Sequence, residues 1–337
     1  MKRLLVTGGA GFIGSNFVRY ILGKYPDYRV TALDALTYAG NLDNFHDLWA
    51  NPNFQFIQGR IEDASIVDNL ARNVDAILNF AAESHNDRAI LDPETAVRSN
   101  FNGVLTLLDA ARKFGHERYL QVSTDEVYGS TTDVFIEGGP LEPNQPYSAA
   151  KAGGELMVRA YNVTFGVPTI VTRGSNTYGP YHFPEKLIPL FITNAIDDLS
   201  LPVYGDGKQV REWMYVLDHC KGIDIAFHQG TPGEVYNVGG DPSCERYNID
   251  VTKQILSYLN KPESLIRYVQ DRPGHDRRYA MDCNKLRALG FAPETDFEKR
   301  LEETVRWYVE NESWWRKIKE KQAGYKEFME KWYAERK

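Results

Sequence analysis

The chain has 337 residues, more than one small hydrophobic core normally holds, so two domains or lobes are expected. Hydrophobic residues make up 42% of the sequence and charged residues 25%, and the net charge of -7 argues against a general nucleic-acid-binding surface. No apolar run approaches the ~20 residues that a membrane-spanning helix needs, so no membrane partner is expected.

The three cysteines, Cys220, Cys244 and Cys283, are far apart and form no CxxC pair. This spacing indicates reduced thiols in a cytoplasmic protein, and it argues against a structural zinc site, so no metal is predicted. The negative net charge does not exclude a small anionic ligand, because basic residues occur locally in the second half of the chain. These residues are Lys186, Arg211, Arg272, Arg277 and Arg278.

The first half of the chain alternates short apolar runs with amphipathic stretches. The runs that predict β-strands are "RLLVTG", "YRVTALD", "FQFIQG", "DAILNFAA", "RYLQVS" and "PTIVTRG". Helical spacing of apolar residues predicts helices over Ile13–Lys24, Ala64–Arg72 and Asn102–Phe114. This alternation predicts an α/β fold with a Rossmann-type, doubly wound parallel sheet that helices cover on both faces.

After Gly174 the pattern becomes irregular, with Pro, Gly and Tyr punctuating the chain. We expect residues 1–176 to form the nucleotide-binding domain, with return segments near 212–238. Residues 177–337 are expected to form mainly a smaller α/β substrate lobe and a helical tail. The aromatic residues of this tail are interpreted as a packing face. They are Trp307, Tyr308, Trp314, Trp315 and Trp332.

The segment "TGGAGFIG" places Gly8, Gly11 and Gly14 between the first predicted strand and the first predicted helix. Without side chains there, the backbone can turn tightly and approach a pyrophosphate, whose charge meets the N–H groups at the helix start. Asp34 ends the next strand, where its carboxylate can accept hydrogen bonds from an adenosine ribose and would repel a 2′-phosphate. The sequence therefore predicts that the first domain binds NAD rather than NADP.

The segment "PYSAAKAGGELMVRAY" predicts a helix that begins at Pro146 and carries Tyr147 and Lys151 on one face. A tyrosine with an ordinary pKa near ~10 is a poor base at neutral pH, but a nearby ammonium and a positive nicotinamide ring both favour the phenolate. Lys151 can also hydrogen-bond the nicotinamide ribose. Together with the glycine turn, this pair resembles the extended branch of the short-chain dehydrogenase/reductase superfamily.

The segment "VSTDEVYG" places Thr124, Asp125 and Glu126 at the end of a predicted strand. Thr124 can polarise a sugar oxygen beside Tyr147, and hydride transfer needs nothing more. Oxidation of C4 of a hexose acidifies the proton on C5, which one carboxylate could remove while a neutral acid protonates the departing C6 hydroxyl. Taken alone, the acidic pair also fits a cap or a solvated turn.

The sequence resembles the nucleotide-sugar 4,6-dehydratases, and most closely those that act on dTDP-glucose. The resemblance runs from Lys2 to about Val309, and it implies NAD as cofactor, dTDP-glucose as substrate and a homodimer formed through helices of the first domain. The implied product is dTDP-4-dehydro-6-deoxy-glucose, a precursor of deoxysugars such as rhamnose. The matching segments are "TGGAGFIGSN", "LTYAGNL", "AAESHNDR", "STDEVYG", "PYSAAKA", "SNTYGPYHFPEKLIP", "REWMYVLDH" and "RPGHDRRYAMD".

The resemblance also implies roles for single residues. Thr124 would polarise the oxygen, Asp125 would be the acid for the C6 hydroxyl, Glu126 the C5 base and Tyr147 the C4 base, with Lys151 assisting. The residues implied to bind the cofactor are Gly8, Gly11, Phe12, Ile13, Gly14, Asp34, Thr37, Arg60, Ile61, Ala81, Ala82, Ser84, Tyr147 and Lys151. The residues implied to bind the substrate are His85, Thr124, Asn176, Glu185, Lys186, Leu187, Arg211, Asn248, Arg272 and His275.

The positive charges of two predicted substrate residues agree with their implied roles. Two other residues depart from the family pattern. Arg211 and Arg272 can hold a diphosphate with bidentate N–H donors. Arg60 stands where the family commonly has an aspartate near the adenine, which leaves adenine recognition open. Asn86 replaces a residue that is more often apolar.

Three alternatives remain at this point. A 4,6-dehydratase could act on a UDP-, CDP- or GDP-linked sugar instead. A nucleotide-sugar 4-epimerase would need Tyr147 and Thr124 but not the acidic pair. A catalytically silent NAD-binding protein could dispense with Tyr147, Lys151 or Glu126, and this chain retains all three.

Overall fold

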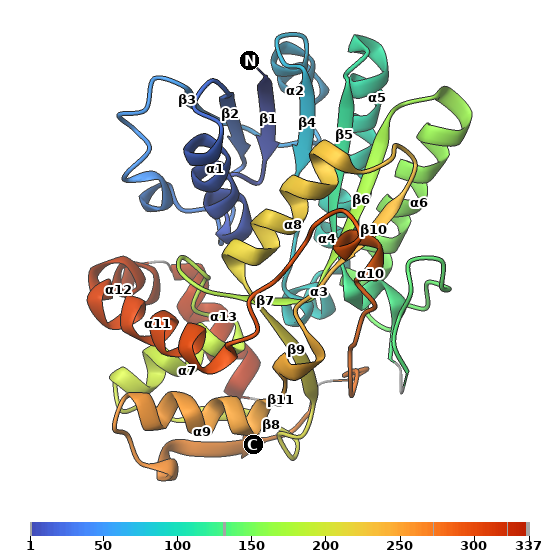
Figure 1. Ribbon diagram of the computed structural model, residues 1–337. Helices are drawn as coiled ribbons and strands as arrows, with labels where there is room; N and C mark the ends of the chain where they lie inside the picture. The colour runs from blue at the N-terminus through green and yellow to red at the C-terminus, as the bar shows by residue number, and fades with distance from the viewer. Residues whose placement is uncertain (1, 131–132, 272, 322, 335–337) are drawn as a thin grey trace.

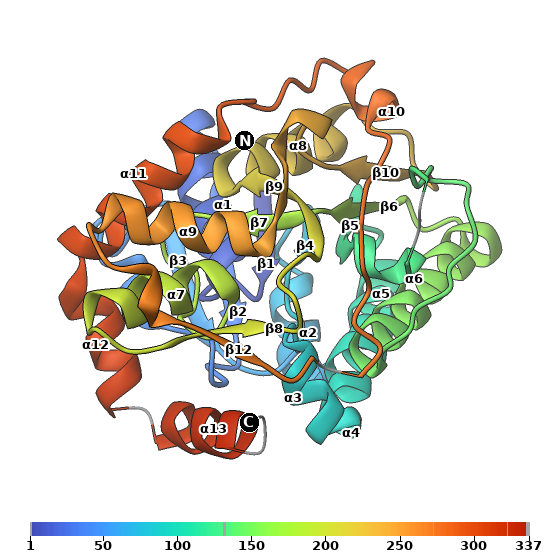
Figure 2. The same cartoon turned by 90° about the horizontal axis from the view of Figure 1, so that it is seen from below.

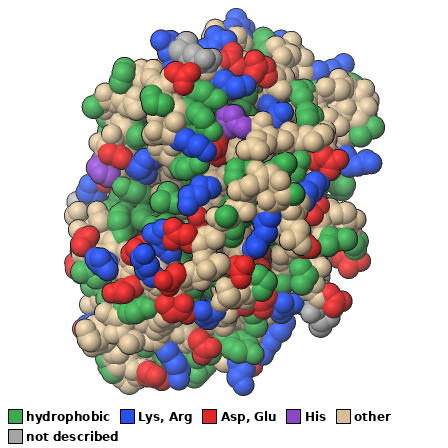
Figure 3. Space-filling view, viewed as in Figure 1, with side chains coloured by type: hydrophobic (Ala, Val, Ile, Leu, Met, Phe, Trp, Pro, Cys, Tyr) green, Lys and Arg blue, Asp and Glu red, His purple; other side chains and the backbone are tan. Residues whose placement is uncertain are grey.

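The computed structural model describes residues 2–130, 133–271, 273–321 and 323–334. Figure 1 shows a larger lobe built on a wide sheet and, below it, a smaller lobe of helices and short strands. Figure 3 shows acidic and basic side chains interspersed over this face of both lobes. Within the described part of the chain, no helix is both long and apolar enough to cross a bilayer. Cys220, Cys244 and Cys283 are buried and form no disulfide.

The larger lobe is built on a seven-stranded parallel sheet with the strand order β10-β6-β5-β4-β1-β2-β3. Its strands are β1 (Arg3–Thr7), β2 (Arg29–Asp34), β3 (Phe54–Gln58), β4 (Ala76–Asn79), β5 (Arg118–Thr124), β6 (Thr169–Gly174) and β10 (Val235–Val238). Every residue of β4 and β6 is buried, as expected for strands covered on both faces. The predicted Rossmann-type fold is therefore confirmed, and the six predicted strands are β1 to β6.

Helices cover both faces of this sheet, each over its own hydrophobic core. On one face α1 (Phe12–Lys24) packs beside α8 (Val216–Gln229), which Figure 1 shows in front of the sheet. On the other face lie α2 (Ala64–Ala71), α5 (Val104–Phe114) and α6 (Pro146–Phe165). The return segment thus contributes α8 and β10 to the larger lobe, although the division into two domains stays a prediction.

Three short helical segments connect β4 to α5. They are α3 (Asn86–Leu91), α4 (Pro93–Val97) and a π-helical stretch, Arg98–Gly103. The helix predicted over Asn102–Phe114 is α-helical only from Val104, because the wider turns of the π-helix occupy the preceding residues. This connection matters for the site, since α3 begins directly after His85.

The smaller lobe contains a three-stranded sheet, β11-β9-β7, and a two-stranded sheet, β12-β8. Its strands are β7 (Asn176–Tyr178), β8 (Leu201–Tyr204), β9 (Val210–Tyr215), β11 (Glu245–Tyr247) and β12 (Ile266–Val269). Its helices are α7 (Leu187–Ile196), α9 (Asn248–Tyr258), α11 (Phe297–Glu310), α12 (Glu312–Lys321) and α13 (Ala323–Ala334), while the short α10 (Asn284–Arg287) lies beside β10. Tyr308, Trp314 and Trp315 are buried in the core of this lobe, as expected for packing residues.

Candidate active site

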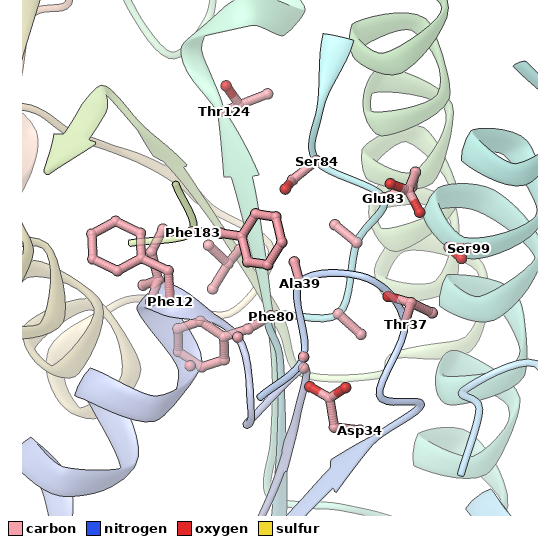
Figure 4. A pocket seen from close by; sticks show the side chains of 18 of the residues that line it. Phe12, Asp34, Thr37, Ala39, Phe80, Glu83, Ser84, Ser99, Thr124 and Phe183 are labelled. Carbon is pink, nitrogen blue, oxygen red and sulfur yellow. The ribbon is translucent and has the colours of Figure 1, made fainter. Parts of the chain in front are cut away.

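A cavity of about 290 Å³ lies at the carboxyl ends of strands β1 to β6. This is the edge of an open parallel sheet at which ligands bind. Figure 4 shows Asp34 near one end of the cavity and Thr124 near the other, with Phe183 and Ser84 between them. Among its lining residues are Gly8, Gly11, Phe12, Ile13, Gly14, Asp34, Thr37, Arg60, Ile61, Ala81, Ala82, Ser84 and Tyr147. We call this space the cofactor cavity.

The glycine turn between β1 and α1 has no room for side chains. Gly8 has a φ of +67°, and a Cβ placed on it would lie 2.5 Å from the backbone nitrogen of Ala81. A Cβ on Gly14 would collide with the carbonyl oxygen of Gly8. No side chain caps α1 at Gly11, so the N–H groups of this helix start are available to an anionic ligand. The turn therefore fits a pyrophosphate.

Asp34, the last residue of β2, is held in a fixed orientation beside this turn. Its two carboxylate oxygens accept hydrogen bonds from the backbone nitrogens of Ala10, at 3.0 Å, and Leu36, at 2.8 Å. Burial raises the pKa of Asp34, while the two backbone donors act in the opposite direction. The position of this carboxylate fits an adenosine ribose. Arg60 lies at the cavity wall with an exposed side chain.

Asp125 and Glu126 directly follow β5. They begin a turn, and their two carboxyl groups lie in different environments. Thr124 caps the turn Asp125–Tyr128: its hydroxyl accepts from the Glu126 nitrogen at 3.3 Å and donates to Asp125 Oδ1 at 3.1 Å. Burial and then the charge of Glu126 raise the pKa of Asp125 well above its ordinary value. Glu126 is only half-buried, and its Oε2 accepts a 2.6 Å hydrogen bond from Asn86 Nδ2. The surroundings of Asp125 thus favour its neutral form, while Glu126 is the more exposed group and is held by the Asn86 amide.

Tyr147 and Lys151 occupy the first two turns of α6, which begins at Pro146 with a capping box between Gln145 and Ser148. Tyr147 lines the cofactor cavity, and burial, followed by the charges of Glu126 and Asp125, raises its pKa. Lys151 lies behind the cavity wall, where its Nζ donates to the Val122 carbonyl at 2.6 Å. Burial lowers the pKa of Lys151 to about 8. Burial and the charges of Glu126 and Asp125 therefore oppose loss of the Tyr147 proton.

A second cavity of about 150 Å³ adjoins the cofactor cavity, and we call it the substrate cavity. Residues that line both spaces include Glu126, Asn176, His182, Glu185 and Lys186, so the two cavities meet at Glu126, while Asp125 lines the cofactor cavity. Of the predicted substrate residues, those that line it are His85, Asn176, Glu185, Lys186, Leu187, Arg211, Asn248 and His275. Thr124 lines the cofactor cavity instead, and Arg272 lies outside the described residues.

Basic groups in the substrate cavity are held by hydrogen bonds. Arg211 Nη2 donates to the Asp276 carbonyl at 2.9 Å and lies 3.0 Å from His275 Nε2. The Nδ1 atom of His275 lies 2.6 Å from Asp271 Oδ1, so the ring donates at Nδ1 and accepts from Arg211 at Nε2. Lys186 donates from Nζ to the Ser84 carbonyl at 2.7 Å. This arrangement fits an anionic diphosphate.

Glu185 is one of three acidic residues that line this cavity, with Asp87 and Glu126. Its carboxylate pairs with Arg88 at 2.9 Å, yet burial raises the pKa of Glu185 to about 7. The Arg88 guanidinium also lies over the ring of Tyr38, 3.8 Å from its centroid, which fixes the pair in place.

Sequence reasoning missed several residues of the site. His182 stacks on Phe12 with ring centroids 4.1 Å apart and lines both cavities, as part of the quoted segment "SNTYGPYHFPEKLIP". Glu83 lies in another quoted segment, and Figure 4 shows it at the cofactor cavity. Tyr204 and Tyr333 line the substrate cavity. Nothing in the sequence pattern around Tyr333 indicates this position.

Comparisons with known proteins agree over nearly the whole chain. The family model described as GDP-mannose 4,6 dehydratase matches residues 5–304. The low-salt glycan biosynthesis protein Agl12 of Haloferax volcanii is 51% identical, over 91% of this chain and 98% of its own. A dTDP-glucose 4,6-dehydratase of an Actinoplanes species is 47% identical, over 93% and 99% of the two chains. The crystal structure of DesIV, a dTDP-glucose 4,6-dehydratase of Streptomyces venezuelae with NAD bound, superimposes with a TM-score of 0.91 at 49% identity, covering 94% of this chain and 99% of that one.

Proposed function

The chain belongs to the nucleotide-sugar dehydratase family that the GDP-mannose 4,6 dehydratase model describes, and we propose that it is an NAD-dependent dTDP-glucose 4,6-dehydratase. The reaction converts dTDP-glucose to dTDP-4-dehydro-6-deoxy-glucose and water. One observation carries the proposal: Asp125 and Glu126, in different environments, line the cofactor cavity together with Tyr147, and Glu126 also lines the substrate cavity. Relatives that are 47% and 49% identical and are named dTDP-glucose 4,6-dehydratases support the nucleotide and the sugar.

NAD is the cofactor; when bound, it would supply the hydride acceptor for C4 of the sugar and the hydride donor for C6. Gly8, Gly11 and Gly14 would receive its pyrophosphate, and Asp34 the adenosine ribose. The hydrogen bond from Lys151 to the Val122 carbonyl holds the ammonium group behind the wall of the cofactor cavity, near Tyr147. There it would stabilise the nicotinamide end of the cofactor. The positive nicotinamide ring opposes the effect of burial and of the two carboxylates on the pKa of Tyr147.

At C4 of the sugar, Tyr147 takes the hydroxyl proton while Thr124 donates a hydrogen bond to the same oxygen. Both side chains line the cofactor cavity. The Thr124 hydroxyl already accepts from the Glu126 nitrogen, and its proton is directed to Asp125 until a substrate oxygen competes for it. Oxidation at C4 makes the C5 proton acidic enough for a carboxylate to remove.

The elimination then needs one base and one acid, which the acidic pair supplies. Glu126 takes the C5 proton, because its carboxylate is half-buried and is fixed by the Asn86 amide. Asp125 gives its proton to the departing C6 hydroxyl, which leaves as water, because burial and the neighbouring charge raise its pKa and favour its neutral form. The C5–H and C6–O bonds break, and a C5–C6 double bond forms; when a hydride returns to C6, Glu126 gives its proton back to C5. The proton that Tyr147 took from the C4 hydroxyl replaces the one that Asp125 lost with the water. A 4-epimerase has no use for either group.

The substrate cavity would hold the rest of the nucleotide-sugar. Arg211 and Lys186 would bind the diphosphate, with His275 holding Arg211, and Asn176, Glu185 and Asn248 would orient the sugar and ribose hydroxyls. Arg272 completes this set in the proposal, although it lies outside the described residues. The product belongs to the precursors of 6-deoxysugars of the rhamnose type.

We also propose a homodimer and a cytoplasmic location. On α6, Leu156 and Val163 expose 57% and 69% of their surface, and α6 packs beside α5. The apolar residues of α5 itself face the sheet: Leu107, Leu108 and Ala111 are buried. The dimer face would therefore be carried mainly by α6. Light scattering on the purified protein tests this, and a single-chain mass at micromolar concentration would contradict it.

The function is tested by incubating the purified protein with the dTDP-, UDP-, CDP- and GDP-linked forms of glucose. We expect dTDP-glucose to lose the mass of one water and to give the alkaline absorbance of a 4-keto-6-deoxysugar. Preferred turnover of another nucleotide would correct the base while keeping the chemistry. Epimerisation at C4 without loss of water would overturn the dehydratase function.

A further inference from the structure

The C-terminal helix α13 lies beside the substrate cavity although it follows the residues that the family model matches. That match ends at residue 304, whereas α13 spans Ala323–Ala334. Figure 2 shows α13 at the edge of the molecule between α12 and α3, the helix that begins next to His85. The helix therefore lies outside the matched region and still reaches the site.

Three contacts attach α13 to segments that carry predicted substrate residues. Tyr325 donates from its hydroxyl to the Pro184 carbonyl at 3.0 Å, directly before Glu185. The Phe328 ring meets the His85 ring edge-on, with centroids 5.3 Å apart. The same ring lies 4.1 Å from the guanidinium carbon of Arg88, the ion-pair partner of Glu185. Movement of α13 would thus disturb both His85 and Glu185.

The third segment is β8, whose last residue is Tyr204. Trp332 Nε1 donates to the Tyr204 hydroxyl at 2.7 Å, and that hydroxyl donates to Asp87 Oδ2 at 2.9 Å. The Tyr333 ring stacks on the Tyr204 ring, with centroids 6.3 Å apart and an interplanar angle of 16°. Two residues of α13 therefore fix the position of one cavity-lining tyrosine.

Tyr333 itself lines the substrate cavity. Together with Pro202, Val203 and Tyr204, it forms an uncharged, partly aromatic section of the wall, while Arg211 and His275 mark a polar section. A diphosphate is matched by the polar section, and a planar, weakly polar nucleobase is matched by aromatic and apolar groups. The two sections are neighbours in one cavity, since the Tyr204 ring meets the His275 ring edge-on with centroids 6.0 Å apart, so a nucleobase on the aromatic section would lie next to the polar section.

We propose that α13 is part of the nucleotide-sugar site and that Tyr333 is a substrate-binding residue, whose ring forms one wall of the nucleobase subsite. This inference rests on the proposed function and deepens it, because it assigns a nucleobase contact to a residue beyond the matched family region. Packing alone would make Tyr333 a stability residue, and the test separates the two roles.

The test compares Tyr333→Ala, Tyr333→Leu and Tyr333→Phe in the full-length protein. Each variant is assayed for kcat and KM with dTDP-glucose, for the Kd of dTDP by calorimetry, and for bound NAD. Loss of the ring in Tyr333→Ala should raise both KM and Kd about tenfold, the factor that corresponds to about 1.4 kcal/mol, with kcat and NAD content unchanged. Tyr333→Leu should give a smaller rise, and Tyr333→Phe should bind dTDP like the wild type.

The matched control is Tyr268→Ala, since Tyr268 lies on β12, the strand paired with β8, and exposes 56% of its surface. This control should leave the dTDP affinity unchanged. Wild-type affinity in both Tyr333→Ala and Tyr333→Leu, or an equal loss of dTDP and NAD, would overturn the inference alone. A wild-type protein that neither binds dTDP nor dehydrates a dTDP-sugar would overturn the proposed function together with it.

Discussion

The cofactor cavity and the substrate cavity are built from the sequence in opposite ways. The cofactor cavity is lined mainly by residues that end or directly follow strands of one sheet, such as Gly8 after β1, Asp34 at the end of β2 and Thr124 at the end of β5. The substrate cavity collects residues from segments as far apart as His85 and Tyr333. A parallel sheet brings its strand ends to one edge automatically, whereas the second cavity depends on how separate segments pack.

This difference predicts which measurement each substitution changes. A change in the cofactor cavity should affect the retention of NAD, and a change in the substrate cavity should affect the KM for the sugar nucleotide. Residues at the junction of the two cavities should change kcat while both ligands still bind. The following predictions test this division from the largest expected effect to the smallest.

Glu126→Gln should produce the largest change, because Glu126 lines both cavities and is the proposed C5 base. The amide keeps the shape of the side chain but cannot take a proton. We expect kcat for dehydration to fall by a factor of about 10²–10⁴, with NAD content and dTDP affinity close to the wild type. Product formation followed by alkaline absorbance checks this, and full activity would remove Glu126 from its role.

Gly8→Ala should weaken NAD binding in the cofactor cavity and leave substrate binding in the substrate cavity unchanged. The added Cβ would lie 2.5 Å from Ala81 N, and the residue has a positive φ of 67°. We expect NAD affinity to fall about 10- to 100-fold, with dTDP binding retained. Gly115→Ala is a matched control, since Gly115 has a φ of 65° with no other group near its Cβ position. Equal loss of NAD in both variants would show that backbone strain alone is responsible.

Asn86→Leu should weaken catalysis at the junction without weakening the fold. The substitution removes the 2.6 Å hydrogen bond to Glu126 Oε2, so the carboxylate is less well fixed. It also removes a buried amide oxygen, Asn86 Oδ1, for which the described residues offer no hydrogen-bond donor. We expect kcat to fall about tenfold while Tm stays equal or rises. Asn86→Asp should lower kcat further by like-charge repulsion, and a raised KM with constant kcat would contradict the positioning role.

The parts of the site that follow local rules could be predicted from the sequence. Gly8, Asp34 and Tyr147 were identified because a glycine turn, a strand-ending carboxylate and a YxxxK helix each place their groups by short-range geometry. The Rossmann-type sheet followed from strand–helix alternation for the same reason. The extra strand β10 was indicated only as a return segment, since its pairing with β6 joins residues more than 60 positions apart.

The residues that the sequence did not reveal depend on long-range packing. Tyr333 carries no motif, and its place in the substrate cavity results from α13 packing against α3 and β8. The different states of Asp125 and Glu126 were also open, because burial of one carboxyl and the Asn86 contact of the other exist only in the fold. Resemblance identified these positions, while the electrostatic difference between them needed the structure.

The smallest predicted effect is a pH dependence of substrate binding that comes from Glu185, which lines both cavities. Burial raises the pKa of Glu185 to about 7, above its ordinary value, so the folded protein holds this proton more tightly than the unfolded chain does. As the pH rises through 7, a negative charge develops in a cavity that receives an anionic diphosphate. Arg88, paired with Glu185 at 2.9 Å, offsets part of that charge. The Kd of dTDP should therefore rise only about two- to threefold between pH 6 and pH 8.

Glu185→Gln should remove this rise, because the amide stays neutral over the whole range. Glu83→Gln is the matched control: burial also raises the pKa of Glu83, but its side chain lines the cofactor cavity and not the substrate cavity. Calorimetric titration of dTDP at both pH values measures the two variants and the wild type. If Glu83→Gln flattened the dependence and Glu185→Gln did not, charge in the cofactor cavity would control substrate binding, and the two cavities would be electrostatically one site.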